Sequence, residues 1–241
     1  MVWSCLVSIL PGMAQTEKLT DYVNPFVGTD GYGNVYPGAQ IPFGGIQISP
    51  DTDSRFYDAA SGYKYNHLTL MGFSLTHLSG TGIPDLGDFL FIPGTGEMKL
   101  EPGTHEDPDQ GYRSRYSHDK EWASPNYYAV ELADYGVKAE MTSGVRSGMF
   151  RFTYPESDNA FIMIDMNHTL WQSCEWSNLR MINDSTITGY KLVKGWGPER
   201  HVYFTATFSK KLTGLRFVQD KSRLFITLPD SAALTKPGER I

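Results

Sequence analysis

Short segments of alternating apolar and polar residues, separated by turn-forming residues, constrain this fold more than any other feature of the sequence. The segment from Asn126 to Ser143, NYYAVELADYGVKAEMTS, indicates two strands joined by a hairpin turn at Asp134-Tyr135-Gly136. Further segments rich in β-branched and aromatic residues follow, with Gly, Pro, Asp or Asn between them: SGMFRFTYP, AFIMIDM, STITGYKLVKG, RHVYFTATFSK and SRLFITLPD. No stretch keeps an apolar period of about 3.6 residues over three helical turns. The pattern predicts an all-β chain that folds as one antiparallel β-sandwich.

The first hundred residues depart from this pattern, because long loops there enclose short apolar strands such as GDFLFIP. The stretch from Asn24 to Thr52 contains six glycines and four prolines. Glycine reaches backbone conformations that are closed to other residues, while proline fixes φ and removes a hydrogen-bond donor. Shaped loops on a rigid sheet are where binding residues concentrate. We therefore expect the functional face among these loops.

The charge of the chain argues against nucleic acid as a partner. The formal net charge is −6, and Lys and Arg form no basic stripe, whereas binding to phosphates needs clustered cations. Aromatic residues make up 13% of the chain, and an acidic, aromatic-rich surface suits neutral polar ligands such as sugars. No apolar run is long enough to cross a bilayer, so no membrane is expected as a partner.

The first 15 residues, MVWSCLVSILPGMAQ, combine a short apolar core with the small residues Gly12 and Ala14 before Gln15. This arrangement is typical of an export signal, although the basic region that usually precedes the apolar core is missing; a disordered apolar tail is the alternative. Export predicts a periplasmic or secreted protein. Cleavage of the signal would leave Cys174 as the only cysteine, which excludes a disulfide framework.

Two loop segments carry enough polar and aromatic residues to be candidate sites. SPDTDSRFYDAASGYKYNH (Ser49 to His67) combines acids, an arginine and several aromatic rings, which suits a sugar platform; the alternative is a surface loop whose tyrosines cover the edge of the sandwich. THLSGTGIPDLGD (Thr76 to Asp88) lacks a Gly-x-Ser-x-Gly elbow and the third glycine of a dinucleotide fingerprint. We expect its His77 to hold a tight turn by a hydrogen bond to the backbone.

No residue pattern predicts a metal site. Asp51 and Asp53 do not continue into a calcium-hand loop, so we expect this acid pair to be solvated or to cap a turn. The six histidines show no H-x-x-x-H spacing on a helix, which argues against zinc.

The tryptophans of the second half lie near the ends of expected strands. Trp171 and Trp176 are expected in the core, because most tryptophans are largely buried. Trp196 stands between Gly195 and Gly197, and we expect it to be exposed at a loop tip.

Five segments, in the same order and spacing, resemble the N-terminal domain of glycoside hydrolase family 92, which comprises bacterial exo-acting α-mannosidases. The resemblance extends from about Asp21 to Lys210. The segments are DYVNPFVGTDGYGNVYPGAQIPFGGIQISPDT, SGYKY, THLSGTGIPDLGD, ASPNYYAVELADYGVKAEMT and KGWGPERHVYFTATFSK.

The resemblance implies an N-terminal β-sandwich of the supersandwich kind, followed in the complete enzyme by a helical (α/α)6 catalytic domain. In the family, calcium binds mannose hydroxyls, and a Glu and an Asp act as general acid and base in an inverting hydrolysis of mannose-containing glycans, N-glycans included. These carboxylates and the main calcium ligands belong to the helical domain. We therefore expect residues 20–241 to form the sandwich, incomplete at its C-terminus, with the catalytic domain absent and with neither catalytic residues nor metal ligands in this chain.

The resemblance also assigns substrate-binding residues. Tyr57-Asp58 stands where the family usually shows Trp-Asp, so we expect Tyr57 to stack on the sugar and Asp58 to accept its hydroxyls. A second pocket-facing loop is expected at Phe26, Gly28, Thr29 and Asp30. The implied partner is the helical domain, in cis or on a second chain, which would complete the mannose pocket.

Two alternatives remain open. The aromatic loop from Tyr57 to Tyr65 also suits a free-standing carbohydrate-binding module. A non-functional gene fragment is the other alternative, and its unused docking surface would be an exposed apolar patch.

Overall fold

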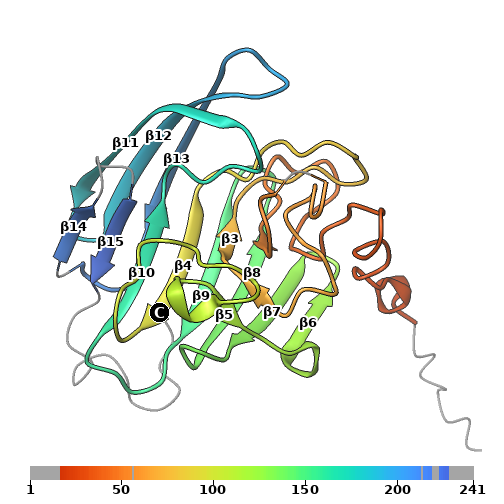
Figure 1. The fold of residues 1–241 in the computed structure, drawn as a ribbon, viewed down its shortest axis with the longest axis horizontal. Coiled ribbons are helices and arrows are strands. Elements are labelled where there is room, and N and C mark those ends of the chain that lie inside the picture. The colour runs from red at the N-terminus through yellow and green to blue at the C-terminus, as the bar shows by residue number, and fades with distance from the viewer. Residues whose placement is uncertain (1–16, 56, 213, 219–222, 228–241) are drawn as a thin grey trace, which may run out of the picture.

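The computed structural model describes residues 17–55, 57–212, 214–218 and 223–227, and Figure 1 shows their arrangement. Besides β-strands, these ranges hold three short 3₁₀ turns, η1 (Leu19–Tyr22), η2 (Pro108–Gln110) and η3 (His118–Lys120). They contain no α-helix, and no helix within them could span a lipid bilayer. The export-like segment of residues 1–15 lies outside the described residues.

The largest sheet has six antiparallel strands in the order β1-β3-β4-β10-β15-β14. Its central pair, β4 and β10, is joined by six residue pairs from Leu90↔Asp165 to Thr95↔Ala160. The strands are β1 (Ser49–Asp51), β3 (Gly72–Ser74), β4 (Leu90–Thr95), β10 (Ala160–Asp165), β14 (Gly214–Val218) and β15 (Arg223–Thr227).

Three smaller antiparallel sheets accompany it. A four-stranded sheet has the order β6-β7-β8-β9, a three-stranded sheet has the order β11-β12-β13, and β2 pairs with β5. The strands are β2 (Thr69–Leu70), β5 (Ser114–Arg115), β6 (Glu121–Ser124), β7 (Tyr127–Leu132), β8 (Val137–Ser143), β9 (Gly148–Thr153), β11 (Ser173–Asn183), β12 (Thr186–Lys194) and β13 (Arg200–Thr207).

The hairpin expected between Asn126 and Ser143 is confirmed. Strands β7 and β8 pair from Leu132↔Val137 outward, and Gly136 turns the chain with a φ of +65°. Only glycine adopts this left-handed conformation without steric cost.

The main hydrophobic core lies between the six-stranded sheet on one side and the four-stranded and three-stranded sheets on the other. Phe91 and Ile162 of β4 and β10 share one buried cluster with Val130 and Met141 of β7 and β8 and with Ile187 of β12. Figure 1 shows the four-stranded and the three-stranded sheet at opposite ends of the six-stranded sheet. The prediction of an all-β antiparallel sandwich is therefore confirmed.

Strand β10 is buried on both faces. Ile162 and Ile164 point into the main core, while Phe161 and Met163 belong to a second cluster on the other face. Met98, Leu100 and Tyr112, from the loop between β4 and β5, cover that second cluster. Double-sided burial explains why this strand is an uninterrupted apolar run in the sequence.

An apolar groove of about 770 Å³ separates β9 from β13. Both are edge strands of their sheets in the part of the chain that the structure describes. The groove reaches the main core, because core side chains such as Phe91, Phe152 and Ile162 form part of its lining. Its aromatic lining residues are Phe89, Phe91, Phe150, Phe152, Tyr203, Phe204 and Phe208.

Two expectations about the second half were wrong. Trp171 and Trp176 are not core residues, since they are 58% and 54% exposed. The sequence pattern also does not predict β11, which contains Trp176 and is exposed along most of its length. Trp196 is 58% exposed, as expected.

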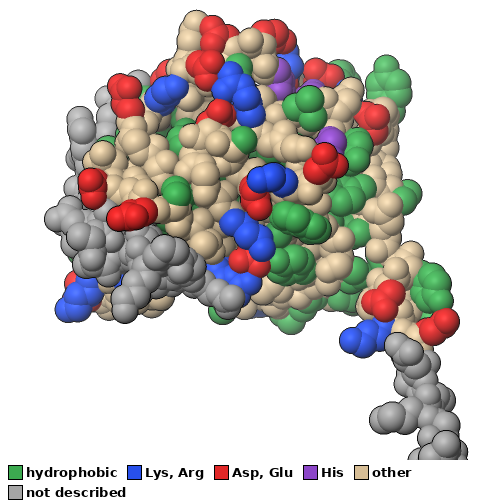
Figure 2. All heavy atoms as spheres, turned by 90° about the horizontal axis from the view of Figure 1, so that it is seen from below, with side chains coloured by type: hydrophobic (Ala, Val, Ile, Leu, Met, Phe, Trp, Pro, Cys, Tyr) green, Lys and Arg blue, Asp and Glu red, His purple; other side chains and the backbone are tan. Residues whose placement is uncertain are grey.

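The surface shows no basic cluster on the face drawn in Figure 2. Lys and Arg side chains lie beside Asp and Glu side chains, with hydrophobic patches between them. Exposed ion pairs of this kind include Arg115 with Asp109 and Asp134, at 2.8 Å each.

Candidate functional site

A pocket of about 550 Å³ lies among the loops of the first seventy residues, which gather at the right of the sandwich in Figure 1. We call it the loop pocket. It is formed by two stretches, one before β1 and one between β1 and β2. Its lining residues are Asp30, Gly31, Tyr32, Arg55, Tyr57, Asp58, Lys64 and Asn66.

The first stretch is a compact turn that presents Asp30. Val35 N donates to Gly28 O at 3.2 Å, and Thr29 N donates to Phe26 O at 3.1 Å. A side chain on Gly33 would meet Gly28 O at 2.2 Å, so this close approach requires glycine.

Three of the residues expected to contact substrate belong to this turn and support it. Thr29 is buried, and its carbonyl accepts from Tyr65 N at 2.9 Å. Phe26 packs edge-to-face on the Tyr65 ring, with 5.7 Å between centroids. Phe26, Gly28 and Thr29 are not among the lining residues, whereas Asp30 is.

Tyr57 is one of the two aromatic residues that line the loop pocket, together with Tyr32. Its side chain is 59% exposed, and its backbone has a φ of +66°. A bulky residue in this left-handed region carries strain of roughly 1–3 kcal/mol, and such strain concentrates at binding sites. The ring is therefore presented by a conformation that the fold imposes.

Asp58 lies beside two cations. Its carboxylate is 3.1 Å from Lys64 Nζ and 3.5 Å from Arg55 Nη2. The hydrogen bond from Lys64 lowers the pKa of Asp58, with Arg55 adding to the effect. The carboxylate is therefore ionised at neutral pH and can accept hydrogen bonds, but it holds no proton to donate.

The charges in the loop pocket largely cancel one another. Arg55 also pairs with Asp53 at 2.6 Å, so both cations already have carboxylate partners. An aromatic ring, a carboxylate and the Asn66 amide together suit a neutral polyhydroxylated ligand, with C–H faces against the ring and hydroxyls on the polar groups.

Directly behind these loops, Asp51 is fully buried between two histidines. Its Oδ1 lies 2.8 Å from His77 Nε2 and its Oδ2 lies 2.8 Å from His168 Nε2. Burial alone would raise the pKa of this carboxyl, but His77 and His168 outweigh it and hold the pKa well below its usual range. The expectation that Asp51 is solvated or caps a turn was wrong.

The contacts of His77 are structural, as expected. Its Nδ1 lies 2.7 Å from Gln47 O, so the backbone holds the ring. Ser74 Oγ and Asp51 Oδ1 both contact Nε2, at 3.0 and 2.8 Å. A catalytic triad places nucleophile and acid on opposite ring nitrogens, so this trio does not activate the serine.

The loop of residues 76–88 is fastened to the three-stranded sheet by its acids. Asp88 lies 3.0 Å from the fully buried Lys191 Nζ on β12 and also pairs with Arg200 on β13. Asp85 accepts a hydrogen bond from Trp196 N at 3.0 Å. These acids hold loops together, which agrees with the structural role expected for this segment.

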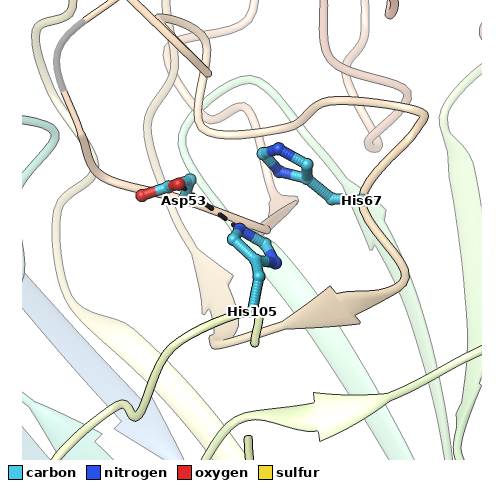
Figure 3. Close-up of side chains that lie close together, drawn as sticks. All are labelled: Asp53, His67 and His105. Atoms are coloured by element: carbon cyan, nitrogen blue, oxygen red, sulfur yellow. Dashed lines mark ion pairs between the residues drawn. The ribbon is translucent and has the colours of Figure 1, made fainter. Parts of the chain in front are cut away.

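Beside the loop pocket, Asp53 meets two histidines from separate loops. Figure 3 shows Asp53, His67 and His105 converging, with Asp53 and His105 joined at 3.3 Å. In the described part of the chain, they form the only group of three such side chains within ligand distance of one another. Asp53 is 4% exposed and therefore not solvated, but its Oδ1 accepts a hydrogen bond from Arg55 N at 2.9 Å, so the expected turn-capping role is confirmed for this acid.

This cluster does not fit calcium, which takes about six to eight oxygen ligands. It offers two imidazoles and one carboxylate. Arg55 occupies Asp53, and Arg113 Nη1 lies 3.2 Å from His105 Nδ1. Two guanidinium groups therefore already supply the positive charge, and we derive no chemistry through a metal here.

Sequence reasoning found three of the lining residues, Asp30, Tyr57 and Asp58, and missed the others. Arg55 and Asn66 lie inside the segment Ser49 to His67, whose composition predicted a sugar platform without assigning a role to either residue. Lys64 stands in SGYKY, and its position beside Asp58 is visible only in the folded chain.

The chain matches known proteins over most of its length. A model of the glycosyl hydrolase family 92 N-terminal domain matches residues 22–237. A curated relative, described as an uncharacterized secreted glycosidase of Arthroderma benhamiae, is 30% identical over 139 residues, covering 57% of this chain and 17% of that protein.

Solved structures show the same fold. A family GH92 alpha-mannosidase from Bacteroides thetaiotaomicron is 86% identical with a TM-score of 0.89, over 95% of this chain and 33% of that one. The same enzyme has also been solved with mannoimidazole, and that structure matches with a TM-score of 0.88. A further GH92 glycosyl hydrolase is 27% identical with a TM-score of 0.73, over 88% of this chain and 31% of that one. The chain thus spans about a third of these solved proteins.

Proposed function

Because this chain belongs to glycosyl hydrolase family 92 and carries its N-terminal domain, we propose that the loop pocket is the mannose-contacting wall of an α-mannosidase. The observation that carries the proposal is the convergence of Tyr57, Asp58 and Asp30 in one pocket. The substrates would be mannose-containing glycans with a terminal α-mannose.

Each residue of the loop pocket has a proposed task. The Tyr57 ring lies against the apolar face of the sugar and keeps water from it. Asp58 accepts hydrogen bonds from sugar hydroxyls, while Lys64 holds the carboxylate in place and ionised. Asp30 and Asn66 supply further polar contacts. These contacts orient the sugar and transfer no proton.

We place proton transfer outside this domain. Inverting hydrolysis needs a general acid and a general base about 6.5–9.5 Å apart, with a water between them. We propose that these carboxylates, a Glu and an Asp, correspond to the two thirds of the solved relatives that this chain does not span. Calcium, held there, would bind mannose hydroxyls and help to distort the ring.

We also propose that the protein acts outside the cytoplasm, in the periplasm or after secretion. The support is the export-like segment of residues 1–15 and a relative described as secreted. N-glycans exposed outside cells would then be accessible substrates.

Binding of methyl α-mannoside to the isolated chain tests the proposal. A half-open pocket buries only part of a sugar, so we expect a Kd near 1 mM, about −4 kcal/mol. Titration followed by NMR should show Tyr57→Ala and Asp58→Asn weakening binding, while Trp122→Ala on β6, an exposed tryptophan outside the lining, leaves it unchanged.

Two results would contradict the proposal. Wild-type affinity in Tyr57→Ala and Asp58→Asn would show that the loop pocket does not bind the sugar. Release of mannose from an α-mannoside by this chain with calcium, above a buffer blank, would show that the acid and base lie within it. Micromolar binding without turnover would instead favour a free-standing carbohydrate-binding module.

A further inference from the structure

Three aromatic side chains form a row across the three-stranded sheet. Tyr190 on β12 pairs directly with Tyr203 on β13 and with Asn178 on β11, and Trp176 lies two residues from Asn178. The ring centroids of Trp176 and Tyr190 are 5.2 Å apart, and those of Tyr190 and Tyr203 are 4.7 Å apart. We call this row the aromatic platform.

The platform lies on the outer face of the sheet. Along β13, Val202 and Phe204 pack on the main core, so Tyr203 between them faces outward. Along β12, Lys191 is buried, so the neighbouring Tyr190 faces outward too. Trp176 and Tyr203 are 54% and 70% exposed, and Tyr203 also borders the groove between β9 and β13.

The three rings are tilted against one another rather than stacked face to face. The plane of Tyr190 is inclined by 54° to that of Trp176 and by 40° to that of Tyr203. Adjacent strands are about 4.8 Å apart, so three strands present a surface about 10 Å long. Such a surface is longer than one sugar ring.

Polar groups fix the platform and surround it. Tyr190 Oη lies 2.7 Å from His201 Nδ1, and His201 Nε2 lies 2.7 Å from Glu199. The His201 ring also stacks on Tyr190, at 5.9 Å between centroids. Rigid aromatic rings beside hydrogen-bonding groups bind ligands that have both apolar faces and hydroxyls, whereas a protein-docking core is usually depleted in charged groups such as Glu199.

We propose that Trp176, Tyr190 and Tyr203 form a second glycan-binding site, which holds a chain of neutral pyranose rings by stacking. The occupant is a polysaccharide or long oligosaccharide lying across the three strands. The site is separate from the loop pocket, since none of its residues lines that pocket. The proposed function enters only in the choice of α-mannan as the probe.

Affinity electrophoresis of the whole 241-residue chain tests this inference, in native gels with and without soluble α-mannan. We expect the wild type to be retarded by mannan, and Trp176→Thr and Tyr203→Thr each to weaken binding about tenfold, as for an interface hot spot. Threonine keeps the strand propensity of these positions. Tyr203→Phe retains the ring and should bind like the wild type, which separates stacking from folding effects.

The matched control is Trp122→Thr on β6, which removes an exposed tryptophan from another sheet and should leave retardation unchanged. Wild-type retardation in Trp176→Thr and Tyr203→Thr, or no retardation of the wild type at all, would overturn the inference. Loss of retardation in Tyr57→Ala alone would overturn it too, while supporting the loop pocket. Loss of mannan retardation in Trp176→Thr and Tyr203→Thr, with unchanged binding of methyl α-mannoside, would support the inference independently of the loop pocket.

Discussion

The stability of this domain should fall in mild acid because of His67. Burial lowers the pKa of His67 to about 4, and the neighbouring His105, whose ring centroid is 4.0 Å away, adds to the effect. Asp53 and Asp58 act in the opposite direction without cancelling it. The unfolded chain has an ordinary histidine pKa of about 6.5, so it binds this proton more readily than the folded chain does.

The sign follows from proton linkage. Where the unfolded state binds more protons, stability rises with pH. The contribution of His67 is therefore complete above about pH 6.5 and is lost progressively as the pH falls toward 4. With these two pKa values, linkage gives a loss of about 2 kcal/mol at pH 5 and about 3 kcal/mol below pH 4.

Urea unfolding at pH 7.5, 6 and 5 measures this loss. His67→Gln removes the titrating group, and its amide can still reach Thr52 Oγ1, which lies 3.0 Å from His67 Nδ1. We expect the wild type to lose about 2 kcal/mol more than His67→Gln between pH 7.5 and 5. Parallel curves for wild type and His67→Gln would refute the reasoning.

Two further substitutions test how the loops are anchored. Lys191→Met leaves Asp88 buried without one of its cations and should lower the free energy of unfolding in urea by about 3–5 kcal/mol. The control Lys194→Met removes an exposed ion pair with Glu175 and should lower it by less than about 1 kcal/mol. Equal losses of stability in the two variants would contradict this prediction. Gly62→Ala places a Cβ 2.1 Å from Asp51 Oδ1 at a φ of +87° and should lower stability by about 2–4 kcal/mol, and an unchanged thermal midpoint would show that the loop can move aside.

Much of the fold could be predicted from the sequence, because strand alternation is a local signal. The run AFIMIDM contains β10, and the hairpin signal at Gly136 marks the turn between β7 and β8. Strand β11 gives no such signal, since its side chains are mostly exposed and its pairing with β12 holds it in place. Apolar alternation in the sequence therefore indicates a strand only where one face of that strand is buried.

The candidate site was less predictable, because its partners are far apart in the chain. Tyr57 and Asp58 were found through a resemblance, not through their own chemistry. Asp51 looked like a solvated loop acid because its neighbours in sequence do not bury it; His77 and His168 do, from 26 and 117 residues away. Distances of that kind are set by the fold and leave no local trace.

The hydrogen bond between Asp51 and His168 can form only after residue 168 has been synthesised, so these loops cannot complete their native contacts before then. The acid leaves the ribosome 117 residues before its second partner, and at 5–20 residues per second that interval is roughly 6 to 23 s. For that time a growing chain carries a charged residue destined for the interior, with one of its two buried contacts not yet made. The loops that line the loop pocket are translated first and completed late, so nascent chains pass through a stage in which chaperones and proteases meet these loops before they have their final shape.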